Sequence, residues 1–198
     1  MARMEPLRRE DVPELADFFD VFEQRMGFLP NSLLTMARRP ELVQAFAGLG
    51  KVVYTPTDSL PLQLRNMIAH IASRASGCLY CVAHTGSNTL KAGSDLEAEK
   101  LEKLWEYESS DLFSDRERVA LRFAQAAAVV PNGVEDEHFE DLRKHFGEQD
   151  IVDILSIISY FGYLNRWNDS MATALEPIPA AIGEAHLAEG GWTVDKHK

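Results

Sequence analysis

The stretch LPLQLRNMIAHIASRASGCLYCVAHTG, residues 60–86, carries the clearest pattern in this 198-residue chain. Its first half has apolar residues at the spacing of one helix face. They are Leu64, Met67, Ile68 and Ile71. Gly77 interrupts this pattern, and a second helix is predicted from Cys78 to about residue 91. The only two cysteines, Cys78 and Cys81, therefore lie one turn apart where the second helix begins.

The rest of the chain has the same helical periodicity, with no period-2 strand pattern. Further helices are predicted over about residues 11–26, 32–39, 40–54, 94–107, 114–129, 135–146 and 148–173. We therefore expect an all-α fold of roughly seven to nine helices. Residues 1–175 are expected to form a single helical domain with the cysteine core at about 61–93. Residues 176–198 are expected to be a loosely ordered C-terminal tail.

Composition narrows the possible partners. The chain is 45% hydrophobic and 26% charged, which is ordinary for a globular protein. Its net charge of −11 argues against nucleic acid or an anionic membrane as partner, because both attract clustered Lys and Arg. No apolar run is long enough to predict a transmembrane helix, and the N-terminus does not resemble a signal peptide. We therefore expect a cytoplasmic protein.

The cysteine pair has three interpretations. In the first it is a redox dithiol, because a thiolate at a helix start meets free N–H groups that lower its pKa. The second sulfur, one turn on, can then close a disulfide, and His84 can reach Cys81 as a proton acceptor. In the second, Cys78, Cys81 and His84 bind zinc, but no further Cys or His pair is spaced to complete a structural site. In the third they are inert buried thiols. We favour the dithiol, with no metal and no cofactor, since there is also no glycine-rich dinucleotide loop.

The segment 60–86 resembles the core of the alkyl hydroperoxidase D (AhpD) and carboxymuconolactone decarboxylase superfamily, particularly its peroxidase-related branch. Residues 27–49 and 112–171 are similar as well, including Asn165-Arg166 in the last long helix. The likeness covers about residues 27–175. It implies an AhpD-like helical bundle that assembles as a homo-oligomer (trimer, hexamer or dimer). It also implies reduction of peroxides by a CxxC pair that cycles between dithiol and disulfide.

In AhpD a glutamate on the preceding helix and a histidine four residues after the second cysteine relay protons to that cysteine. Here the glutamate position is Asn66, and the histidine position is Thr85, with His84 one residue early. His84 can serve Cys81 but not both sulfurs. His70, one turn after Asn66, is a possible substitute, although a core histidine is the simpler interpretation. The candidate site is therefore Cys78, Cys81 and His84, with His70, Asn66 and Thr85 as a possible relay.

The leading hypothesis is a thiol-dependent peroxidase in which Cys81, or Cys78, attacks a hydroperoxide and the other cysteine closes the disulfide. An external dithiol or a thioredoxin-like protein would reduce it again. One alternative is a carboxymuconolactone decarboxylase-type lyase, although members of that branch generally lack the CxxC pair. The other is a redox-sensing oligomeric protein without turnover, which the altered relay makes more credible.

Overall fold

The computed structural model describes residues 2–92 and 95–198, and these residues form ten α-helices and no strand. The helices are α1 (Ala16–Met26), α2 (Asn31–Met36), α3 (Pro40–Val53), α4 (Leu62–Ala75), α5 (Leu79–Thr89), α6 (Asp95–Glu102), α7 (Asp115–Ala128), α8 (Asp136–His145), α9 (Glu148–Met171) and α10 (Pro177–Ile182). The all-helical prediction is confirmed. The helix expected over 94–107 is α6 followed by a 3-10 turn, Leu104–Glu106, and its first expected residue, Ser94, lies outside the described residues.

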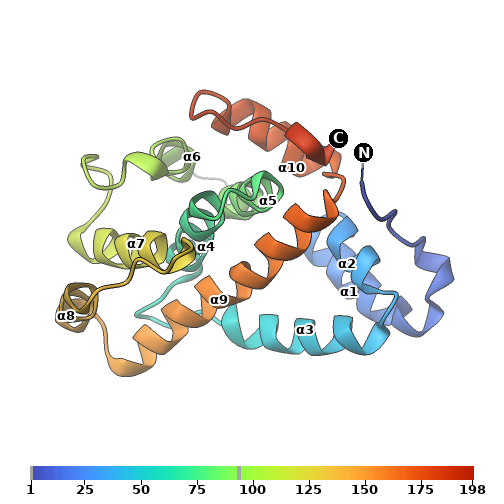
Figure 1. Cartoon of the computed structure of the whole chain (residues 1–198), viewed down its shortest axis with the longest axis horizontal. Helices are drawn as coiled ribbons and strands as arrows, with labels where there is room; N and C mark the ends of the chain where they lie inside the picture. Colours follow the sequence, from blue (N-terminus) through green and yellow to red (C-terminus); the bar gives the residue numbers. More distant parts are fainter. Residues whose placement is uncertain (1, 93–94) are drawn as a thin grey trace.

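The long helix α9 organises the bundle (Figure 1). It packs against α4, α5 and α7 on one side and against α3 on the other. Because it has neighbours on several sides, apolar residues occur around most of its circumference. Ile154, Ile157 and Phe161 are buried in the main core, together with the apolar face of α4. The candidate cysteines lie on α5, which is held between α4 and α9.

Gly77 sets the angle between α4 and α5. Its φ of 74° is in the left-handed region that favours glycine. The Gly77 N–H donates to Arg74 O (3.0 Å), and the Cys78 N–H donates to Ser73 O (3.1 Å). These two bonds make a Schellman ending for α4. Cys78, which completes the Schellman motif, is also the N-cap of α5. The first cysteine of the pair therefore lies directly at the junction of the two helices.

The C-terminal segment is not loosely ordered, which corrects the sequence-based expectation. Residues 177–182 form α10, which packs on α5 (Figure 1). Trp192 is buried against α5, and its Nε1–H donates to Leu79 O (2.9 Å). Gly183 permits this packing, because a Cβ there would lie 2.5 Å from the Trp192 ring. The segment has no long periodic stripe, but a few large contacts hold it in place.

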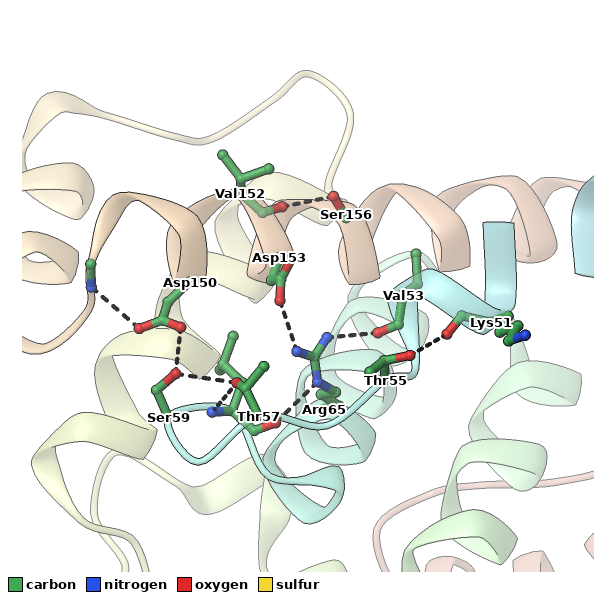
Figure 2. A network of polar contacts seen from close by, with 12 residues as sticks. Lys51, Val53, Thr55, Thr57, Ser59, Arg65, Asp150, Val152, Asp153 and Ser156 are labelled. Atoms are coloured by element: carbon green, nitrogen blue, oxygen red, sulfur yellow. Dashed lines mark hydrogen bonds and ion pairs between the residues drawn. The ribbon is translucent and has the colours of Figure 1, made fainter. Parts of the chain in front are cut away.

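A buried arginine fixes the connection between α3 and α4. The guanidinium of Arg65, fully buried, donates to Val53 O (2.7 Å), Leu60 O (3.0 Å) and Asp153 Oδ2 of α9 (2.8 Å). Figure 2 shows these bonds converging on Arg65 from three parts of the chain. Buried carbonyl groups need hydrogen-bond donors, and in this non-helical connection the arginine supplies them. Tyr54, the residue after Val53, packs against the main core, where its ring contacts Tyr160 and Phe161.

No helix among the described residues is both long enough and apolar enough to cross a membrane.

Candidate functional site

The two cysteines lie together at the N-terminus of α5 as free, buried thiols. Cys78 is the N-cap, and its Sγ accepts a hydrogen bond from the Cys81 N–H (3.4 Å). From the other side, Asn168 Nδ2 of α9 donates to Cys81 Sγ (3.5 Å). Burial and the neighbouring Cys78 sulfur raise the pKa of Cys81 well above its ordinary value, and the Asn168 amide partly offsets this. A raised pKa means that Cys81 needs a base to take its proton before it can react as a thiolate.

His84 is not bonded to a cysteine sulfur among the contacts of the described residues. Its Nε2 lies 2.6 Å from Glu176 Oε2, and its ring stacks on Tyr80 with centroids 4.3 Å apart. Phe28 contacts the same ring edge-on at 5.5 Å. Because Glu176 engages Nε2, the Nδ1 atom is left for a different partner, as where carboxylates orient catalytic imidazoles. His84 remains a neighbour of Cys81, one turn away on the same helix.

Glu176 is the residue that sequence reasoning missed. It is the N-cap of α10, and its carboxylate is buried. Its Oε1 accepts the Asn31 N–H (2.5 Å) and the Tyr80 O–H (2.8 Å), while Oε2 faces His84. Although burial alone would raise the pKa of Glu176, the His84 ring and these hydrogen bonds hold it below its ordinary value. No motif connects Glu176 to His84 in sequence, since 92 residues separate them.

Of the three predicted relay residues, His70 and Thr85 contact each other, and among the described residues no hydrogen bond joins any of the three to a sulfur. His70 Nδ1 lies 3.0 Å from Thr85 Oγ1, and the Thr85 hydroxyl donates to the Cys81 carbonyl (2.8 Å). Asn66 Nδ2 donates to Asn88 O (3.3 Å), one turn further along α5. Burial lowers the pKa of His70 to about 3, so its ring is neutral at physiological pH. These contacts favour a packing role for His70, between α4 and α5.

In the part of the chain that the structure describes, no group of three or more His, Cys, Asp or Glu side chains is placed to hold a metal ion. His84 and Glu176 are paired with each other.

Known proteins are similar to this chain in both sequence and fold. The Carboxymuconolactone decarboxylase family model matches residues 40–126, from α3 into α7. The uncharacterized protein YnjA of Escherichia coli (strain K12) is 30% identical over 131 residues, which are 66% of this chain and 69% of that protein.

Two solved structures extend the likeness over nearly the whole chain. A cysteine-to-alanine variant of the debrominase Bmp8, in complex with 2,3,4-tribromopyrrole, is 36% identical with a TM-score of 0.83, covering 91% of this chain and 95% of that one. An uncharacterized peroxidase-related protein with an alkylhydroperoxidase AhpD core, from Ralstonia eutropha JMP134, is 26% identical with a TM-score of 0.77, covering 90% and 94%. With its all-helical fold and its paired cysteines, the chain belongs to the carboxymuconolactone decarboxylase family, in the AhpD-like superfamily.

Proposed function

We propose that the chain is a thiol-dependent peroxidase that reduces hydroperoxides through Cys78 and Cys81. The observation that carries the proposal is the position of the pair: both sulfurs lie in the first turn of α5, and the Cys78 sulfur caps that helix. Cysteines one turn apart can form a disulfide with little movement of the backbone. Because burial raises the pKa of Cys81, the cycle also needs a base that takes the proton of this thiol.

The reaction has two steps. The Cys81 thiolate attacks an oxygen of the hydroperoxide, the O–O bond breaks, and an S–O bond forms, giving sulfenic acid. The proton of the thiol ends on the leaving oxygen, which departs as the alcohol. Cys78 then attacks the sulfenic sulfur, releasing water and closing the disulfide. An external dithiol, or a thioredoxin-like protein, supplies two electrons and two protons to restore both thiols.

We assign proton transfer to the pair formed by His84 and Glu176. The sequence lacks the relay glutamate expected at Asn66, but a different glutamate, Glu176 at the start of α10, contacts His84. A carboxylate that holds one imidazole nitrogen orients the ring and fixes its tautomer. His84 is then oriented to take the Cys81 proton, directly or through one water.

The test is hydroperoxide consumption by the reduced protein with dithiothreitol as donor. The proposal expects consumption by the wild type, loss of turnover in Cys81→Ser and in Cys78→Ser, and slower turnover in His84→Ala. A Cys81→Ser protein that is as active as the wild type would contradict the assignment. Lactone turnover that survives replacement of both cysteines would favour the lyase alternative. Reversible disulfide formation without peroxide consumption would favour the redox sensor.

Reductive dehalogenation is a second candidate, favoured by the similarity to the debrominase Bmp8. The same dithiol balances this reaction: an aryl bromide and two thiols give the hydrogen-substituted arene, a disulfide, bromide and a proton. Release of bromide from 2,3,4-tribromopyrrole, with dithiothreitol as donor, tests it. Bromide release without any hydroperoxide consumption would replace the first candidate with the second.

We also propose a cytoplasmic homo-oligomer. The cytoplasm supplies the thiol reductants that the cycle needs. Between α3 and α9 runs an apolar groove of about 530 Å³ whose lining includes Leu49, Val152 and Leu155, all exposed. Exposed apolar grooves of this kind are common where subunits meet. Light scattering on the wild type and on Val152→Glu tests this: an oligomer that the charge dissociates supports it, and a monomeric wild type contradicts it.

A further inference from the structure

Three buried polar groups on α9 or packed against it have bonding capacity left unused. Neither Asn165 Oδ1 nor Asn165 Nδ2 has a hydrogen-bond partner among the described residues, and both atoms are buried. Within residues 2–92 and 95–198, the same holds for Asn168 Oδ1 and for the Tyr54 hydroxyl. The two asparagines are 3% and 1% exposed. Such groups are rare in native proteins, because each costs free energy, so each requires an explanation.

Their placement around the sulfur follows from α9. Asn168 Nδ2 donates to Cys81 Sγ, which fixes the face of α9 that meets the cysteine. Asn165 lies one turn earlier on that same face, and Phe161 lies one turn before Asn165. The Tyr54 ring packs edge-on against Phe161, with centroids 6.2 Å apart.

The phenol hydroxyl of Tyr54 belongs to the same neighbourhood. Burial, and then the nearby Tyr160 and Cys81 groups, raise the pKa of Tyr54. The Tyr54 ring contacts Tyr160 and Phe161 of α9, with centroids 6.3 and 6.2 Å apart. The Arg65 bond to Val53 O fixes the backbone directly before Tyr54 (Figure 2).

We propose that Tyr54, Asn165 and Asn168 form the subsite that binds the O–O–H group of the substrate beside Cys81, with Asn165 at its centre. This rests on the proposed peroxidase function. A hydroperoxide group offers one donor and two acceptor oxygens. The cluster offers the matching set: amide N–H donors at Asn165, amide oxygens as acceptors, and a phenol that can do either. The donors also stabilise the negative charge that develops on the leaving oxygen as Cys81 attacks.

The Asn165 amide, which has no hydrogen-bond partner among the described residues, suggests a discriminating experiment. Asn165→Leu replaces an unpartnered amide with an apolar side chain of similar shape. If the amide serves the substrate, the change removes binding capacity without removing a hydrogen bond of the fold. We therefore expect the melting temperature to stay the same or rise, while oxidation of the reduced protein by cumene hydroperoxide slows by about tenfold to a hundredfold. Alkylation by iodoacetamide, which needs only the thiolate, should stay within about twofold of the wild-type rate.

A pair of tyrosine variants gives the matched control. Tyr54→Phe removes a hydroxyl that has no hydrogen-bond partner among the described residues, whereas Tyr107→Phe removes a hydroxyl that donates to Gln125 Oε1 of α7 (2.7 Å). We expect slower peroxide oxidation only in Tyr54→Phe, and a lower melting temperature only in Tyr107→Phe.

The outcomes separate the subsite from the function. If hydroperoxide oxidises Asn165→Leu and Tyr54→Phe as fast as the wild type, the subsite proposal is overturned and the peroxidase proposal stands. Equal slowing of oxidation and alkylation, with a lower melting temperature, also overturns it, since the amide would then be structural. A wild type that hydroperoxides do not oxidise overturns both proposals.

Discussion

Replacing Glu176 by glutamine tests whether the C-terminal segment holds the site together. A glutamine Oε1 can still accept the Asn31 N–H and the Tyr80 O–H, which both bond Oε1 of the glutamate. What it loses is the negative oxygen facing His84 at 2.6 Å. A hydrogen bond to a charged group contributes about 1.5–3 kcal/mol, and breaking a buried pair costs about 3–5 kcal/mol. With two of three bonds retained, we expect Glu176→Gln to lower the free energy of unfolding by about 2–3 kcal/mol.

The chain contains its own control for this experiment. His186 Nδ1 and Glu102 Oε1 form a pair of the same chemistry at 2.9 Å, but their side chains are 27% and 49% exposed. Solvent-exposed pairs contribute about 0–1 kcal/mol, so Glu102→Gln should have little effect. Urea unfolding at pH 7, followed by circular dichroism, measures both variants. The reasoning is refuted if Glu176→Gln is no more destabilising than Glu102→Gln.

Acid provides a second check on the same variant. The pKa of Glu176 is held below its ordinary value of 4.5, so its ionised form stabilises the folded state. That contribution is complete above the unfolded pKa and is lost as the pH falls through the folded pKa. The difference between wild type and Glu176→Gln should therefore be constant near neutral pH and shrink below about pH 4.5. A difference that is unchanged in acid would contradict the charge-based account.

Other features of the fold and the site give further expectations. Gly77→Ala should cost about 1–2 kcal/mol in urea unfolding, because φ is 74° there, whereas Gly48→Ala in the exposed interior of α3 should stabilise by about 0.5–1 kcal/mol. Trp192→Ala should lower the free energy of unfolding by about 3–5 kcal/mol, against almost nothing for a loose tail. Because the pKa of Cys81 is raised above 9.0, stopped-flow oxidation by hydroperoxide should still accelerate above that pH; a plateau near neutrality would identify another attacking thiolate.

Much of the fold could be predicted because helices repeat their apolar residues at a regular interval. The ends of α4 and the start of α5 follow from Gly77 and from the break in that pattern. The segment after residue 175 has no long stripe, so its order was missed. Its stability comes from a few contacts between distant residues, such as Trp192 with Leu79, and no local pattern encodes them.

The candidate site divides in the same way. The cysteine pair and its position at a helix start could be predicted from their spacing in the sequence. The partner of His84 could not, because Glu176 reaches it from an element 92 residues away. Arg65 was missed for a similar reason: it lies in an apolar stretch, and its three acceptors belong to other segments (Figure 2).

The most direct test of the central claim is the stoichiometry of a single turnover. The fully reduced protein is mixed with a limiting amount of cumene hydroperoxide, and free thiols, peroxide and intact mass are measured together. The account predicts that two thiols disappear for each hydroperoxide consumed, with a mass loss of two hydrogen atoms and a disulfide joining Cys78 to Cys81. Hydroperoxide consumed without loss of thiols, or thiols lost into oxidised forms with no Cys78–Cys81 disulfide, would contradict it.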